Sequence, residues 1–303
     1  MPPAPPTCPE KPWRLTVVVE NTAPKGSGLV AEHGLALWLE TEGAAVLFDT
    51  GASGQALARN AQRLGVPLAR AGAVVLSHGH GDHTGGLATA LAAAPEATVW
   101  HGPGCLGERW ARRWGVTKAI GIPAPSRKAA EAATRREAAA PVVLPEGLML
   151  SGPVPGSPAA AQRGFLAAPP SRPSPGSSSS EPSPRGRVPD PFRDELFALL
   201  RTPDGWALIT GCCHRGLENT LRHARQLTGG APVAVVVGGL HLARLPRREW
   251  DAAAAAIEAA GTRYVLAGHC TGERALAYLA SHTKARVEPL HAGLTCPGFA
   301  RRE

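Results

Sequence analysis

The chain has 303 residues, enough for one large domain with a substantial core, and its 44% hydrophobic and 18% charged fractions are typical of a soluble globular protein. No run of eighteen apolar residues occurs and the N-terminal sequence lacks the apolar segment of a secretory signal, so we expect neither a membrane span nor export. The net charge of +8 suits an anionic small molecule as partner. Much of the arginine lies in a variable-looking middle segment, which does not favour nucleic acid.

The cysteine pattern points away from a disulfide-stabilised protein. Two of the cysteines are adjacent and one follows a histidine, a pattern better suited to thiol or metal chemistry. The six are Cys8, Cys105, Cys212, Cys213, Cys270 and Cys296. We therefore expect a cytoplasmic protein, and the sequence leaves a homo-oligomer open.

The first half of the chain alternates apolar runs with segments of helical spacing, after a tail at residues 1–12 that we predict to be disordered. We predict strands at Arg14–Glu20, Leu35–Glu40, Ala44–Asp49, Ala73–Leu76 and Thr98–His101. We predict helices at Ser53–Leu64, His83–Ala93 and Gly104–Trp114. Residues 41–43 then join two strands in a hairpin.

Residues 152–190 are rich in Pro, Ser, Gly and Ala, and have too few apolar side chains to offset the entropy of ordering them. We predict a flexible insertion there, within a single domain at residues 13–295 that is followed by a C-terminal tail at 296–303.

The second half repeats the pattern of hairpin followed by alternating helix and strand. We predict strands at 141–151, Glu195–Arg201, Trp206–Thr210, Val233–Val237, Arg263–Leu266 and Ala285–Glu288, and helices at Gly216–Leu227, Arg247–Ala260 and Thr271–Ala280. Two such halves can pack sheet on sheet with helices outside. The expected fold class is therefore α/β, a four-layer αββα sandwich.

A histidine-rich loop directly follows the short buried strand at Ala73–Leu76. Within six residues it offers the imidazoles of His78, His80 and His83 and the carboxylate of Asp82, ligands that suit Zn²⁺, Mn²⁺ or Fe. Loops at the carboxyl ends of sheet strands commonly collect ligands. A solvated loop that meets metal only by accident is the alternative, but its position after a buried strand argues against it. The loop therefore predicts a metal site.

The segment Ser77–Gly86 resembles the signature motif of the metallo-β-lactamase superfamily, and Phe48–Gly51 resembles its upstream motif. Further similarity at residues 31–34, 210–214, 238–242 and 268–272 extends to the branch that contains 7,8-dihydropterin-6-ylmethyl-4-(β-D-ribofuranosyl)aminobenzene 5′-phosphate synthase and related metal-dependent hydrolases. It covers residues 14–290 apart from the insertion. The resemblance implies the αββα fold and one or two divalent metal ions. His78 and His80 would bind one ion, Asp82 and His83 a second, and Asp49 would support the loop from behind.

Two departures from the family pattern affect the remaining ligands. The only counterpart of the usual third-motif histidine is His101, which lies at a strand end where a structural role is favoured. Cys212 replaces the usual bridging aspartate. By the resemblance His269 completes the second metal's ligands, His214 can supply the missing imidazole, and Cys212 is a tentative, softer ligand. Cys213 should point away if the strand alternates. Cys212 favours Zn²⁺, while Mn²⁺, Fe and Mg²⁺ stay open.

Three further residues are candidates for contact with a substrate. His241 follows a buried strand and a glycine pair, so it is either a substrate contact and proton donor or a hydrogen-bonded core histidine. Glu32 and His33 are weaker candidates for the cavity rim, where a plain turn is the alternative.

Three functions remain open at this point. The first is hydrolysis of an anionic or phosphorylated small molecule by a metal-bound water, with Asp82 orienting the water and His241 protonating the leaving group. The second, implied by the resemblance, is a transferase of the pterin synthase type with a diphosphate leaving group. The third is a non-catalytic metal-binding sensor on the same fold.

Overall fold

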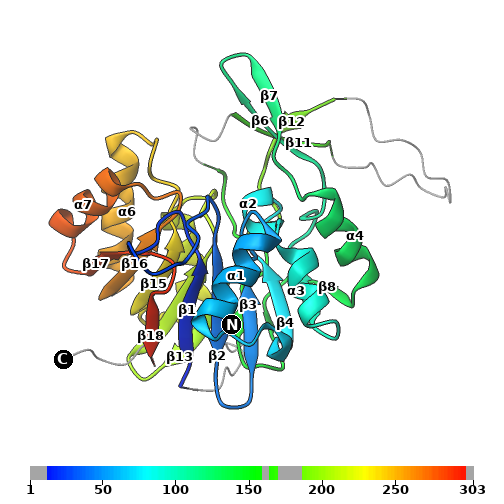
Figure 1. Cartoon of the computed structure of the whole chain (residues 1–303). Coiled ribbons are helices and arrows are strands. Elements are labelled where there is room, and N and C mark those ends of the chain that lie inside the picture. The colour runs from blue at the N-terminus through cyan, green and yellow to red at the C-terminus, as the bar shows by residue number, and fades with distance from the viewer. Residues whose placement is uncertain (1–11, 159–163, 170–185, 298–303) are drawn as a thin grey trace.

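Two seven-stranded sheets pack face to face in the computed structural model, which describes residues 12–158, 164–169 and 186–297. Helices cover both outer faces of this pair, as Figure 1 shows. One buried apolar cluster draws residues from both sheets, and two others join each sheet to its helices. The predicted four-layer αββα architecture is confirmed.

The first sheet has the strand order β18-β1-β2-β3-β4-β5-β8. Its strands are β1 (Arg14–Val19), β2 (Ala36–Glu40), β3 (Ala45–Phe48), β4 (Ala73–Leu76), β5 (Thr98–His101), β8 (Arg135–Glu137) and β18 (Thr295–Pro297). The helices after them are α1 (Gly54–Leu64), the 3-10 helix η1 (Leu68–Arg70), α2 (Gly81–Thr84), α3 (Leu87–Ala93) and α4 (Ala124–Ala132). Strands β3, β4, β5 and β8 run parallel, so their carboxyl ends share one edge.

The second sheet has the order β17-β16-β15-β14-β13-β10-β9. Its strands are β9 (Val142–Val143), β10 (Met149–Leu150), β13 (Phe197–Thr202), β14 (Gly205–Thr210), β15 (Val235–Gly239), β16 (Tyr264–Gly268) and β17 (Arg286–Pro289). Its helices are α5 (Leu217–Leu227), α6 (Arg247–Ala259) and α7 (Glu273–His282). Strands β14 to β17 are parallel, which again gathers strand ends at one edge.

Alternation along β4 explains why a four-residue strand can fix the position of the loop that follows. Val75 faces the cluster between the sheets, whereas Val74 and Leu76 face the helices. All three are fully buried. A slip by one residue would exchange the two faces of the strand, so the apolar run sets the register in which the chain leaves it at Ser77.

A third, four-stranded sheet projects beyond the sandwich in Figure 1, and we call it the cap sheet. It consists of β6 (Arg109–Arg113), β7 (Val116–Ala119), β11 (Phe165–Ala167) and β12 (Val188–Pro189). The helix predicted at Gly104–Trp114 is therefore wrong. Gly104 takes a φ of +76°, and the residues of Arg109–Arg113 pair their backbone groups with Val116–Ala119 in a hairpin instead of forming a helix.

Two predictions about disordered segments also need correction. The predicted insertion at 152–190 contains β11 and β12, which are ordered because they pair with β6 and with each other. Residues 159–163 and 170–185 of that insertion lie outside the described residues. The predicted tail at 296–303 begins inside β18, where Cys296 pairs with Leu15 of β1. Residues 1–11 and 298–303 again lie outside the described part.

A buried arginine ties the cap sheet to the histidine-rich loop. Arg109 Nε lies 2.7 Å from Asp190 Oδ2, and Arg109 Nη2 lies 3.1 Å from Asp194 Oδ2. Asp194 Oδ2 also accepts a 2.8 Å hydrogen bond from the backbone N–H of Gly79. All three charged side chains are buried, so their charges are balanced within the protein and not by water.

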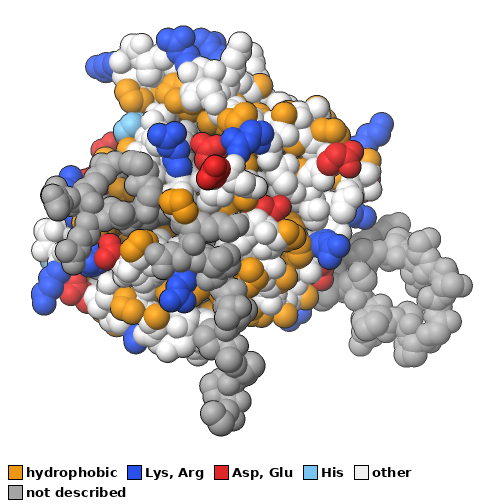
Figure 2. All heavy atoms as spheres, turned by 90° about the horizontal axis from the view of Figure 1, so that it is seen from below, with side chains coloured by type: hydrophobic (Ala, Val, Ile, Leu, Met, Phe, Trp, Pro, Cys, Tyr) orange, Lys and Arg blue, Asp and Glu red, His pale blue; other side chains and the backbone are white. Residues whose placement is uncertain are grey.

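The surface of the sandwich carries charges of both signs. On the face drawn in Figure 2, Lys and Arg side chains are interspersed with Asp and Glu. No helix in the described part of the chain is long and apolar enough to cross a lipid bilayer.

Removal of the buried cation should destabilise the fold. We expect Arg109→Met to lower the free energy of unfolding by about 3–5 kcal/mol, because Asp190 and Asp194 would stay buried without their partner. The control is Arg222→Met, which breaks the exposed 3.4 Å pair with Glu218 and should cost at most about 0.5 kcal/mol. Urea unfolding of both variants tests this, and equal losses would contradict it.

Candidate metal centre

The histidine-rich loop leaves β4 through a tight passage that only glycine fits. A Cβ atom on Gly79 would lie 2.1 Å from the carbonyl oxygen of Cys105 and 3.2 Å from Asp194 Oδ2. Gly79 therefore allows the loop to pack closely against Cys105 and Asp194. His78 and His80 precede α2, and their ring centroids lie 4.6 Å apart in the same interior space.

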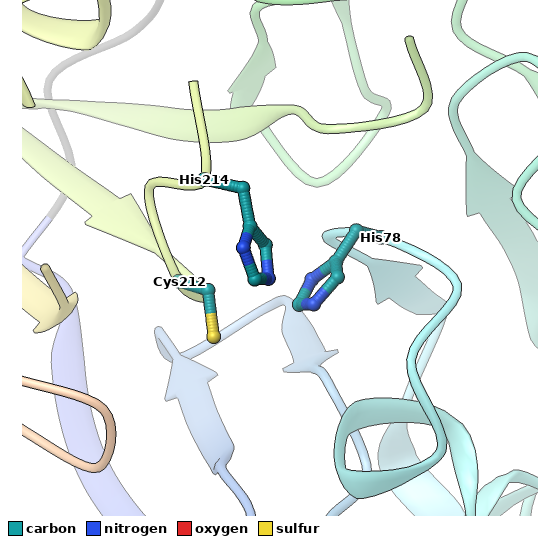
Figure 3. A group of neighbouring side chains, drawn as sticks. All are labelled: His78, Cys212 and His214. Atoms are coloured by element: carbon teal, nitrogen blue, oxygen red, sulfur yellow. The ribbon is translucent and has the colours of Figure 1, made fainter. Parts of the chain in front are cut away.

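His78, His80, His214 and Cys212 form the first group of potential ligands. The ring centroids of the three histidines lie 4.6–4.9 Å apart. One donor atom each from His78, Cys212 and His214 lie within 4.8 Å of one another, and Figure 3 shows the three side chains pointing toward a common space. Among the described residues, the buried Nε2 atoms of His78 and His80 have no hydrogen-bond partner.

Asp82, His83, His269 and Cys212 form the second group. His83 Nε2 lies 3.1 Å from His269 Nε2 and 3.2 Å from Cys212 Sγ. Asp82 Oδ2 lies 3.5 Å from His269 Nε2 and 3.9 Å from His83 Nε2. Because Cys212 belongs to both groups, it lies between them, where the resemblance placed a bridging residue.

Asp49 holds the loop from behind. Its Oδ1 accepts a 2.7 Å hydrogen bond from the backbone N–H of Ser77, and its Oδ2 lies 2.7 Å from both Ser77 Oγ and His83 Nδ1. Ser77 Oγ in turn lies 2.9 Å from His78 Nδ1. With Nδ1 of both histidines engaged in this way, their Nε2 atoms point to the interior.

A separate pair of polar residues at the end of β1 orients His269. Glu20 Oε1 accepts a 2.6 Å hydrogen bond from the backbone N–H of His269, and Asn21 Oδ1 lies 3.0 Å from His269 Nδ1. Glu195 orients His214 in the first ligand group, because its Oε1 accepts a 2.6 Å hydrogen bond from the backbone N–H of His214. The sequence analysis missed these three residues, although Glu20 and Asn21 directly follow a β-branched strand.

Burial sets the protonation of the histidines. It lowers the pKa of His80 and of His269 to about 4, and that of His78 well below its usual value, so these rings are neutral at neutral pH. Burial would also lower the pKa of His83, but the charges of Asp49 and Asp82 outweigh it and raise the pKa to about 9. The neutral rings leave lone pairs free to bind a cation.

These residues fit one or two divalent metal ions. The buried Nε2 atoms of His78 and His80 have no partner among the described residues. The Nε2 atoms of His83 and His269 face each other at 3.1 Å, with the Asp82 carboxylate beside them. A bound cation would interact favourably with all of these groups. Imidazole, carboxylate and thiol form a donor set that suits Zn²⁺ best.

The residues predicted to contact a substrate have mixed outcomes. The ring centroid of His241 lies 4.3 Å from that of His214, and its Nδ1 is buried without a partner among the described residues, so it faces the centre. His33 is exposed and its Nε2 lies 3.3 Å from Asp82 Oδ2, at the rim. Glu32 has another role. Its carboxylate accepts hydrogen bonds from Ala52 and Ser53 and so fixes the start of α1.

Two residues lie outside both ligand groups. His101 is buried in β5 with its Nδ1 2.9 Å from the carbonyl oxygen of Gly102. Cys213 packs into the apolar cluster beneath the second sheet's helices, and its Sγ lies 3.2 Å from Thr210 Oγ1. Both positions agree with the structural roles favoured by the sequence.

Two phenylalanines that sequence reasoning did not identify wall the first ligand group. The Phe165 ring of the cap sheet lies 5.2 Å from the rings of both His80 and His214. Phe192 stacks on His214 at 4.2 Å. Phe165 precedes and Phe192 follows a proline- and serine-rich stretch, and the composition of that stretch gave no indication of residues that contact a site.

Loss of the support behind the loop should weaken metal binding. We expect Asp49→Asn to lower Zn²⁺ affinity about 10–100-fold, because an amide has one acceptor oxygen and cannot accept hydrogen bonds at both carboxylate positions, the one bonded by the Ser77 backbone and the one shared by Ser77 Oγ and His83 Nδ1. Competition with a chromophoric chelator measures this. Asp204→Asn, at a carboxylate paired with Arg263, is the control, and an equal affinity in both variants would contradict the role of Asp49.

Comparisons with known proteins agree with this geometry. The chain is 25% identical over 288 residues to the 7,8-dihydropterin-6-methyl-4-(beta-D-ribofuranosyl)-aminobenzene-5′-phosphate synthase of Methanocaldococcus jannaschii, across 92% of this chain and 95% of that one. A crystal structure of a metal-dependent hydrolase of the beta-lactamase superfamily superimposes with a TM-score of 0.76 and 26% identity, across 94% of this chain and 98% of the other.

A more distant metallo-beta-lactamase fold protein from Bacillus subtilis has a TM-score of 0.52 and 11% identity, across 94% of this chain and 99% of that one, which supports the fold alone. The family model of the metallo-beta-lactamase superfamily matches residues 30–214. That range contains the histidine-rich loop, Asp49, Cys212 and His214. The chain therefore belongs to the metallo-beta-lactamase superfamily.

Proposed function

We propose that the protein is a metal-dependent hydrolase acting on an anionic or phosphorylated small molecule. The observation that carries the proposal is the convergence of two ligand groups on Cys212, with buried imidazole nitrogens that lack protein partners. The ligands would be His78, His80, Asp82, His83, His214, His269 and Cys212. A bound divalent ion supplies a water of lowered pKa and neutralises negative charge on the substrate.

Asp82 and His241 carry the proton chemistry in this proposal. Burial would raise the pKa of Asp82, but His83 and its other histidine neighbours lower it well below its usual value, so the carboxylate stays ionised and can orient a water. Burial would lower the pKa of His241, but Cys270 outweighs it and raises the pKa. His241 would then donate a proton to a leaving group from its buried Nδ1, which has no partner among the described residues.

The cap sheet supports a substrate that is both unsaturated and anionic. Phe165 is half-buried beside the ligand groups, so part of its ring remains free for contact. In the sheet register Phe165 lies opposite Ala111, and Ala111 lies opposite the exposed Lys118. Directly opposite residues share a sheet face, so a cation lies on the same face as the aromatic wall.

Group transfer is the second candidate, and the extended similarity to the pterin synthase favours it. In that reaction the leaving diphosphate would need the same neutralisation, while Phe165 and Phe192 would help to exclude water from the attacking partner.

Turnover of two kinds of substrate separates the candidates. Protein loaded with Zn²⁺, Mn²⁺ or Mg²⁺ should cleave bis(p-nitrophenyl) phosphate if it is a hydrolase. If it is a transferase, it should consume a dihydropterin diphosphate, and only when an amine acceptor is present. His80→Ala should abolish turnover and lower bound metal together, whereas His282→Ala, at an exposed histidine on α7, should change neither. Tightly bound metal with neither reaction would instead support the sensor.

Truncation of the aromatic wall should weaken substrate binding. We expect Phe165→Ala to raise KM roughly threefold to tenfold, the effect of losing about 0.5–1.5 kcal/mol of aromatic contact. Trp114→Ala, at the 89% exposed residue of the cap hairpin, is the control and should leave KM unchanged. Steady-state kinetics with an aromatic phosphodiester measures both, and an unchanged KM in Phe165→Ala would remove this residue from the substrate site.

A further inference from the structure

Two thiols from different loops meet beside the second ligand group. Cys212 follows β14 and Cys270 follows β16, and their Sγ atoms lie 3.4 Å apart. His241 follows β15, the strand between them. Three neighbouring parallel strands therefore deliver two sulfurs and one imidazole to a single point at the carboxyl edge of the sheet.

The geometry of these three side chains is that of a ligand group. One donor atom each from Cys212, His241 and Cys270 lie within 4.8 Å of one another. The backbone N–H of His241 donates to Cys270 Sγ at 3.2 Å, the polarity that suits a negatively charged sulfur. Cys212 Sγ also lies 3.2 Å from His83 Nε2, so the group is continuous with the proposed centre.

The Cys270 thiol packs against a position that only glycine can occupy. A Cβ atom on Gly239 would lie 2.7 Å from Cys270 Sγ and 2.4 Å from the carbonyl oxygen of Gly211. Gly239, at the end of β15, is thus needed to admit the sulfur. Three residues that flank or form this point, Cys213, His241 and His269, have left-handed φ angles of 59°, 49° and 52°. Such strain at residues other than glycine concentrates at functional sites.

Cys213 provides the contrast for a thiol that only fills space. It lies in an apolar cluster on the other side of the sheet. Cys212 and Cys270 lie instead among imidazoles, where a buried thiol gains little as an apolar group. Simple packing therefore explains Cys213 but not the other pair.

We propose that Cys270 is a metal ligand together with Cys212 and His241, and that this sulfur-rich side makes the centre select thiophilic divalent ions such as Zn²⁺, Co²⁺ or Cd²⁺ over Mg²⁺ and Mn²⁺. The inference rests on the metal centre of the proposed function. On binding, each thiol loses its proton to solvent and its sulfur donates a lone pair to the ion, with no change in oxidation state. Soft thiolates bind such ions more strongly than hard ones.

Cobalt substitution tests the assignment without any assay of activity. The reduced, metal-free full-length protein is loaded with Co²⁺, and the thiolate-to-cobalt charge-transfer absorption is measured per bound ion. We expect Cys270→Ser to lower this absorption to roughly half, since one of two thiolates is lost. Cys213→Ser is the matched control from the neighbouring position and should leave it unchanged. Zn²⁺ affinity should fall in Cys270→Ser, whereas Mg²⁺ affinity should not.

The outcomes separate the inference from the proposed function. Absorption in Cys270→Ser equal to that in Cys213→Ser overturns the assignment. Cobalt bound without a thiolate band in the wild-type protein also overturns it but leaves a histidine and carboxylate centre, whereas no bound cobalt overturns the centre as well. If Cys270→Ser fails to fold, X-ray absorption of the wild-type zinc form decides, with two sulfur ligands expected and fewer than two against.

Discussion

The buried carboxylate of Asp49 joins three parts of the proposed centre. It accepts hydrogen bonds from the backbone and hydroxyl of Ser77 and from the ring of His83, and Ser77 passes the orientation on to His78. A fully buried carboxylate is costly unless it is hydrogen-bonded, so these contacts are fixed together or lost together. The orientation of the loop, the tautomers of two imidazoles and the direction of their lone pairs therefore all depend on one side chain, which sits at the end of β3 with a φ of 58°.

The cap sheet extends this dependence beyond the αββα sandwich. Arg109 anchors it through Asp190 and Asp194, and Asp194 also binds the backbone of Gly79 in the histidine-rich loop. Phe165 then reaches from the cap sheet to the rings of His80 and His214. The segment at 152–190, whose composition indicated flexibility, thus supplies an aromatic side chain that packs against the proposed metal ligands. Its strands are ordered because the backbone groups of β11 pair with β6 and with β12, not because their own side chains form a core.

The sequence predicted the parts of the site that are local in the chain. His78, His80, Asp82 and His83 fall within six residues after an apolar run, and the resemblance supplied Asp49, His214 and His269. It also missed contributors whose polar atoms act at long range: Glu20 reaches His269 across 249 positions, and Asp194 reaches Gly79 across 115. Glu20 directly follows a β-branched strand, but nothing in the residues around Asp194 distinguishes it from an ordinary surface carboxylate. The contact of Glu32 with the start of α1 likewise arises only in the fold.

The sequence by itself determined the αββα architecture, the edge at which ligands gather and the histidine-rich loop, because period-two apolar runs and turn residues act locally and fix strand register. The tertiary structure decided which side chains complete the centre. Cys212 lies between both ligand groups, Cys270 meets it at 3.4 Å, and Cys213 turns away. Strand alternation had separated Cys212 from Cys213 in the sequence, but the sequence assigned no role to Cys270. The different surroundings of the three cysteines arise only when parallel strands β14, β15 and β16 bring separate loops to one edge, a contact that no local pattern encodes.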